Sequence, residues 1–145
     1  MSDKIYIWEA GNGNVGHGSM TLHDGTHISW WPKDDKSKSS AKSHMTSVEA
    51  DTASSYNQDT EWEGQAADRM IPIKKGKLDI ATIKAWWMQF RDKSNYHLLG
   101  NNCCSVIYEA LKRGGATKYA SFPWNPISTP ANLKDYALKL KEATQ

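Results

Sequence analysis

The first part of the chain alternates apolar and polar positions, which is the spacing of half-buried strands. Residues 4–8 (KIYIW) alternate in this way and are rich in β-branched and aromatic side chains. Residues 17–31 (HGSMTLHDGTHISWW) repeat the pattern on both sides of Asp24-Gly25, a pair that favours a tight hairpin turn. Residues 70–73 predict one more strand. We therefore expect an antiparallel sheet that includes an early hairpin.

Residues 33–68 interrupt this pattern. The segment is rich in Ser, Lys, Asp and Thr and has few apolar side chains. A polar excursion of this length within a compact domain is more often a functional lid or an insertion than a simple spacer. We therefore expect a polar loop or lid over residues 33–68.

In the second half of the chain the apolar spacing becomes helical, and three segments begin at residues suited to cap a helix. These caps are Asp79, Asn102 and Thr129, the last followed by a proline at the first helical position. The predicted buried faces consist of Ile80, Ile83, Trp87 and Phe90; Val106, Ile107, Ala110 and Leu111; and Leu133, Tyr136, Ala137 and Leu140. Strands followed by helices indicate a single α+β domain over residues 1–145.

Composition excludes some classes of function. The chain of 145 residues has 18 basic and 16 acidic side chains, and no basic block interleaved with aromatics, so nucleic acid is not an expected partner. The seven Trp and six Tyr favour a well-packed domain with an aromatic-lined cleft. The N-terminus lacks the apolar run of a signal peptide, and no stretch is long enough to span a bilayer. We therefore expect synthesis in the cytoplasm.

The only two cysteines, Cys103 and Cys104, are adjacent and directly follow the predicted cap Asn102. Adjacent cysteines close no useful loop, and their geometry rarely suits a disulfide. Without a CxxC partner they also fall short of a zinc site, so no metal or other cofactor is expected. The first turn of a helix stabilises an anion such as a thiolate. Two interpretations remain open: small buried residues or a reactive thiol.

A nucleophilic thiol needs a base, and histidine is the usual one. The chain has five histidines: His17, His23, His27, His44 and His97. His17 begins a predicted strand directly after GNGNVG, where small residues allow a close approach by a substrate or another segment. His27 shares one face of the next strand with Ser29. His97 precedes the cysteine helix and could lie near it, whereas the other two are expected to be solvated.

Two segments together resemble a known family of thiol enzymes. HGSMTLHDGTHISWWP is similar to the histidine hairpin of the lecithin:retinol acyltransferase-like family, and YHLLGNNCCSVI resembles the asparagine–cysteine block of that family. Those proteins are circularly permuted relatives of NlpC-type and papain-type thiol hydrolases, in which the histidine precedes the cysteine. The resemblance implies a circularly permuted papain-like fold, with an antiparallel sheet packed on helices. ISWWP and the NNC block look closer to bacterial effector domains, such as the Rho-inactivation domain of large multifunctional toxins.

Position by position, the resemblance implies that Cys103 is the nucleophile and His17 is its base. Cys104 falls where relatives have another residue, so packing or support is its expected role.

The third catalytic residue stays open. The second histidine of the acyltransferase family falls on Ser29, and His27 lies two residues earlier. In the effector branch the third member is an aspartate further along, for which Asp51 is the candidate.

The resemblance implies a secreted bacterial effector that uses a Cys–His pair for acyl transfer. The first expectation is a phospholipase or acyltransferase that forms a fatty-acyl thioester from a lipid and passes the acyl group to water or an amine. One alternative is a cysteine peptidase or amidase acting on a protein or on peptidoglycan. The other is an inactive binding module, which the missing second histidine keeps open. Delivery by a dedicated secretion system would explain the missing signal peptide, and bacterial targets would imply an immunity protein.

Overall fold

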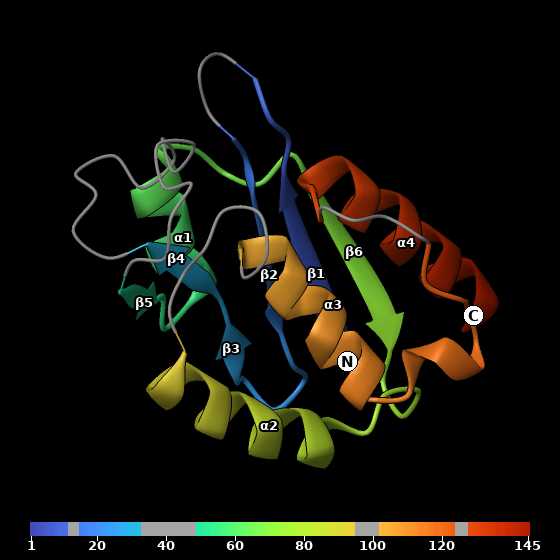
Figure 1. Cartoon of the computed structure of the whole chain (residues 1–145). Coiled ribbons are helices and arrows are strands. Elements are labelled where there is room, and N and C mark those ends of the chain that lie inside the picture. Colours follow the sequence, from blue (N-terminus) through green and yellow to red (C-terminus); the bar gives the residue numbers. More distant parts are fainter. Residues whose placement is uncertain (12–14, 33–48, 95–101, 124–127) are drawn as a thin grey trace.

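The computed structural model describes residues 1–11, 15–32, 49–94, 102–123 and 128–145 (Figure 1). The strands are β1 (Ser2–Trp8), β2 (His17–Thr21), β3 (His27–Ile28), β4 (Trp30–Pro32), β5 (Ala50–Thr52) and β6 (Arg69–Lys74). The helices are α1 (Tyr56–Glu63), α2 (Ile80–Lys93), α3 (Cys103–Arg113), the short 3-10 helix η2 (Ala116–Lys118) and α4 (Pro130–Ala143). His44, which is expected to be solvated, and His97, which could lie near the cysteine helix, are both outside the described residues.

A four-stranded antiparallel sheet with the order β3-β2-β1-β6 forms the centre of the domain. The predicted hairpin is confirmed: β2 and β3 are joined by a turn in which the Leu22 N–H donates to the Thr26 carbonyl. Gly25 has a φ of 97° in this turn, a conformation that favours glycine. β4 leaves the sheet and pairs with β5 in a separate two-stranded ribbon.

One face of the sheet is apolar and carries the main core. Ile5 and Ile7 of β1 are fully buried, and the β1–β6 register puts Ile71 and Ile73 on the same face, because side chains alternate along a strand. Leu133 of α4 and Cys104 of α3 pack over Gly18 on this face. Figure 1 accordingly shows α3 crossing over β1 and β2, with α4 beside β6.

The opposite face of the sheet is aromatic and polar. Trp8 lies opposite His17 in the β1–β2 register, and Tyr6 lies on the same face of β1. Tyr56 of α1 stacks on Tyr6 with ring centroids 4.2 Å apart, and its ring lies 5.7 Å from that of Trp8. The second face is therefore covered by α1.

All three predicted helix caps are confirmed. The side chains of Asp79, Asn102 and Thr129 each accept a hydrogen bond from the backbone N–H three residues later. These bonds satisfy amide groups that a helix start leaves without partners. The mixed α+β class and the antiparallel sheet are therefore as predicted. No helix among the described residues is long and apolar enough to cross a membrane.

The loop expected over residues 33–68 is wrong for the part that the structure describes. Residues 49–68 contain β5 and the two-turn helix α1. The buried residues of α1 are Asp59 and Glu63, so apolar spacing gave no sign of this helix. Residues 33–48 lie outside the described part of the chain, and a lid role stays a prediction.

Candidate active site

Cys103 is the first residue of α3, and the side chain of Asn102 caps the helix in front of it. The Cys103 residue is 7% exposed, and its sulfur lies 3.8 Å from the sulfur of Cys104. A hydrogen bond from Cys104 holds the pKa of Cys103 well below its usual range, against burial, which raises it. The positive charge of His17 and a backbone hydrogen bond from Gly18 act in the same direction as Cys104. This environment favours the thiolate.

His17 lies at the start of β2 and is almost completely buried. Its ring stacks on Trp31 at a centroid distance of 3.9 Å and is tilted against Trp8 at 5.4 Å. Burial lowers the pKa of His17, but the negative charge of Cys103 and the interaction with Asp59 outweigh it and raise the pKa to about 10. The electrostatic interaction between the two groups therefore favours the thiolate form of Cys103 and the imidazolium form of His17.

Asp59 of α1 connects the polar side chains of this region. Its Oδ1 accepts hydrogen bonds from Ser29 Oγ at 2.5 Å and from Trp31 Nε1 at 2.9 Å, and its Oδ2 lies 2.6 Å from His27 Nε2. Burial raises the pKa of Asp59, but the charge and hydrogen bond of His17 outweigh it and hold the pKa well below its usual range. A fully buried carboxylate is kept ionised by these partners.

Ser29 stands between His17 and Asp59. His17 Nε2 lies 2.9 Å from Ser29 Oγ and 3.4 Å from Asp59 Oδ1. Because Ser29 Oγ donates its proton to Asp59, it accepts from the His17 Nε2–H. This bond holds the Nε2 side of the His17 ring in place.

The structure brings four predicted residues, Cys103, His17, Ser29 and His27, into one region. His27 contacts Thr21 through Nδ1 at 2.8 Å and Asp59 through Nε2, so its ring helps to position the carboxylate.

Asp59 is the acid at the His17 ring, whereas the proposed Asp51 lies on β5 opposite Trp31. Sequence reasoning missed Asp59 because it lies in a polar segment without apolar periodicity. The available signal was the helix start Ser55-x-x-Gln58, where Ser55 accepts from the Gln58 N–H and Gln58 Oε1 accepts from the Ser54 N–H.

Glu63 is a second carboxyl group that sequence reasoning missed, one helical turn after Asp59. The residue is 5% exposed, and neither carboxyl oxygen has a hydrogen-bond partner in the part of the chain that the structure describes. Burial raises the pKa of Glu63 to about 7; the charge of His17 lowers it, and the charges of Cys103 and Asp59 raise it. Glu63 can therefore change its charge near neutral pH, within the electrostatic field of the Cys–His pair.

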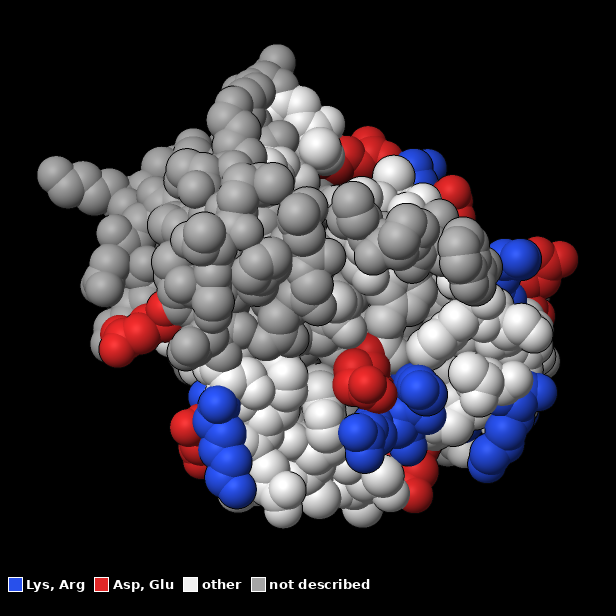
Figure 2. All heavy atoms as spheres, in the orientation of Figure 1, with Lys and Arg blue, Asp and Glu red and all other residues white. Residues whose placement is uncertain are grey.

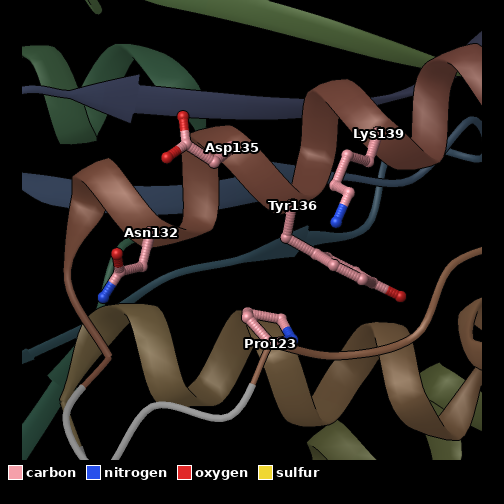
Figure 3. Close-up of a pocket in the computed structure, with 5 residues that line it drawn as sticks. All are labelled: Pro123, Asn132, Asp135, Tyr136 and Lys139. Carbon is pink, nitrogen blue, oxygen red and sulfur yellow. The ribbon is translucent and has the colours of Figure 1, made fainter.

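Two other features of the surface do not belong to this cluster. A pocket of about 120 Å³ lies beside α4 and is smaller than a typical ligand site (Figure 3). Its lining residues are Pro123, Asn132, Asp135, Tyr136 and Lys139. On the face shown in Figure 2, basic and acidic side chains of the described residues lie side by side rather than as one basic patch.

Within the described ranges no group of three or more His, Cys, Asp or Glu could hold a metal ion.

The fold and this cluster define an α+β domain with a buried cysteine, histidine and aspartate brought together from α3, β2 and α1. The chain belongs to the IcsB middle domain family, whose model matches residues 44–145. The match includes Asp59 and Cys103 and begins after His17.

Two relatives are known by the name multifunctional-autoprocessing repeats-in-toxin, from Vibrio vulnificus and from Vibrio cholerae serotype O1 (strain ATCC 39315 / El Tor Inaba N16961). Each is 34% identical to this chain over 80 residues, which cover 52% of the chain. The chain spans only 2% of the length of these relatives. No solved structure matches the chain.

Proposed function

We propose that this domain is a thiol enzyme that transfers acyl groups, with Cys103 as nucleophile and His17 as acid and base. The observation that carries the proposal is the hydrogen-bonded series His17, Ser29, Asp59 beside a cysteine whose pKa is depressed. Histidine held by an acid and paired with a nucleophile is the arrangement of catalytic triads on unrelated folds. Asp59 takes the role of orienting acid, and Ser29 transmits its influence to the ring.

In the proposed first step the Cys103 thiolate attacks the carbonyl carbon of an acyl ester. The backbone N–H groups in the first turn of α3 offer stabilisation to the oxyanion that forms. The imidazolium of His17 gives its proton to the leaving oxygen, and a thioester on Cys103 results.

In the second step water or an amine loses a proton to His17 and attacks the thioester. The C–S bond breaks, which restores the thiolate and the imidazolium. Throughout both steps Asp59 stays ionised and stabilises the charged ring, because its pKa lies well below neutral pH.

The proposal includes the circularly permuted papain-like fold. Its support is the chain order of a strand histidine before a helix cysteine, with the strand part of an antiparallel sheet packed on that helix. The inactive binding module is a weaker hypothesis, because Asp59 can take the orienting role of the second histidine that this chain lacks.

We further propose that the domain acts as a bacterial effector toxin on lipid acyl groups, delivered to its target cell by a secretion system. The toxin role is taken from the names of the two Vibrio relatives. The lipid substrate is taken from the acyltransferase-like family. Action on a protein or on peptidoglycan as a peptidase or amidase remains the alternative, because the same Cys–His–Asp chemistry cleaves amides.

The test compares the purified protein with Cys103→Ala on liposomes whose phospholipid carries a labelled acyl chain. We expect fatty acid release by the wild type and an acyl adduct on Cys103, removed by hydroxylamine, in its intact mass spectrum. His23→Gln serves as a matched control, since His23 binds Asp3 outside the cluster. The peptidase or amidase alternative would replace the lipid proposal if no fatty acid is released from the liposomes, while peptidoglycan sacculi or casein are cleaved by the wild type and not by Cys103→Ala.

A further inference from the structure

The second thiol of the adjacent pair lies within reach of the first. Cys104 is fully buried, and its sulfur lies 3.8 Å from the sulfur of Cys103, within the range of a hydrogen bond between sulfur atoms. Successive residues of a helix point about 100° apart, since about 3.6 residues make one turn. The convergence of the two sulfurs is therefore specific to their side-chain rotamers and surroundings, rather than a consequence of being neighbours.

Gly18 on β2 makes room for this arrangement. A Cβ atom on residue 18 would lie 3.2 Å from the Cys104 sulfur and 2.7 Å from a methyl carbon of Leu133. A side chain here would push the helix or the thiol away from the sheet. The same glycine also donates its backbone N–H to Cys103, so the strand contacts both cysteines.

The direction of the sulfur–sulfur hydrogen bond follows from the charges. A thiolate has no proton to donate, so the neutral thiol must be the donor. The surroundings make Cys103 the thiolate, because His17 is positively charged beside it. The pKa of Cys104 is raised well above its usual range, first by its hydrogen bond to Cys103 and then by burial, so it keeps its proton.

We propose that Cys104 is a positioning residue of the site: its S–H group donates to the sulfur of Cys103 and holds that sulfur as the thiolate. The inference rests on the proposed role of Cys103 as nucleophile. It gives a specific form to the expected role of Cys104 in packing or support. Three separate groups then stabilise one sulfur anion, namely the imidazolium of His17, the backbone N–H of Gly18 and the thiol of Cys104.

The bond from Cys104 should affect the reactivity of Cys103 mainly at pH values below the midpoint of its ionisation. A thioester sulfur is a poor acceptor, so the bond from Cys104 is weakened when Cys103 is acylated. In the free enzyme the bond lowers the pKa of Cys103 and so increases the fraction of thiolate. It does not make each thiolate more nucleophilic, because the nucleophilicity of a thiolate falls as its pKa falls. Among the described residues, the titratable groups that interact with the sulfur pair include His17 on β2, Glu63 on α1 and Tyr108 on α3, and Asp59 on α1 interacts with His17.

The experiment measures the rate of iodoacetamide labelling at Cys103 against pH, with the modified residue identified by peptide mass spectrometry. Cys104→Ala removes the donor, and Cys104→Ser keeps a donor of similar size. We expect Cys104→Ala to move the midpoint up by about one pH unit, which is about tenfold less thiolate on the acid side. Cys104→Ser should remain close to the wild type, and the labelling rate at high pH should not fall in either variant.

Two outcomes would overturn the proposal: an unchanged midpoint in Cys104→Ala, or equal shifts in the Ala and Ser variants, which would assign the effect to packing. The infrared S–H band of Cys104 in the wild type gives a second measurement if a variant does not fold. The band should lie at lower frequency while Cys103 is ionised and move up when Cys103 is alkylated, whereas a band indifferent to alkylation contradicts the bond. Labelling needs no substrate, so these results stand apart from any failure of the acyl-transfer proposal.

Discussion

The two faces of the central sheet carry different kinds of interaction. One face buries aliphatic side chains such as Ile7 and Ile73 under α3 and α4. The other face buries His17 and, through α1, Asp59. Apolar burial is non-directional and tolerates local rearrangement, whereas a buried ionised cluster depends on each hydrogen bond being made. The comparison leads us to expect that aliphatic contacts on the first face mainly affect stability, whereas the polar contacts of His17 and Asp59 on the second mainly affect the proposed activity.

Among the residues that orient His17, Asp59→Asn is expected to have the largest effect on activity. The change keeps the shape of the side chain and removes the charge that supports the His17 imidazolium. We expect the rate of acyl transfer to fall by about 10⁴-fold, as it does when the orienting aspartate of a serine protease triad is changed in this way. Circular dichroism checks that the fold persists. The opposite ranking, with an inactive Asp51→Asn and an active Asp59→Asn, would refute the assignment of Asp59.

A matched change on the apolar face should act on stability alone. Ile73 is fully buried, and we expect Ile73→Ala to lower the free energy of unfolding by about 2–5 kcal/mol, because it removes apolar contacts and leaves a cavity. Urea denaturation measures this loss. The pH midpoint of Cys103 alkylation should not move, and a clear shift would show that the two faces are not separable.

Ser29→Ala should separate the two contacts of His17. The change removes the hydroxyl between His17 Nε2 and Asp59 while leaving the charge of Asp59 in place. We expect turnover to fall by about one to three orders of magnitude, and to be abolished in His17→Ala, on the scale of general acid–base contributions. Part of the loss should be recovered in Ser29→Thr, which restores a hydroxyl.

His27→Ala is expected in the same range, because it removes a hydrogen bond that holds Asp59. Turnover at saturating substrate measures both effects. Wild-type turnover in both Ser29→Ala and His27→Ala would mean that Asp59 orients the ring without help from either side chain.

The smallest effect is expected at Glu63, and it concerns the pH dependence of stability. The pKa of Glu63 is raised from an ordinary value of 4.5 to about 7 in the folded chain. As the pH rises, this carboxyl group therefore loses its proton in the unfolded chain before it does so in the folded chain. Stability contributed by the neutral carboxyl is present at low pH and is lost as pH rises through this window. Glu63→Gln lacks this loss. Its melting temperature relative to the wild type should be higher at about pH 8 than at about pH 5. An equal difference at both pH values would contradict the raised pKa.

Local signals predicted much of the fold but only part of the site. The Asp24-Gly25 turn and the caps Asp79, Asn102 and Thr129 were found because each signal lies within a few residues of the structure it specifies. The helix α1 was missed because its buried residues are charged, and a pattern of apolar positions cannot register a buried carboxylate.

The sequence by itself determined the early hairpin, the three capped helices of the second half and the place of Cys103 at a helix start. These depend on side-chain periodicity and on hydrogen bonds between near neighbours. Only the tertiary structure decided that Asp59 meets Ser29, 30 positions earlier in the chain, and that His17 lies beside both. The reason is that a buried charge needs charged or hydrogen-bonding partners, and the tertiary packing supplies them. These partners can lie at any distance along the chain, so a local sequence pattern does not reveal them.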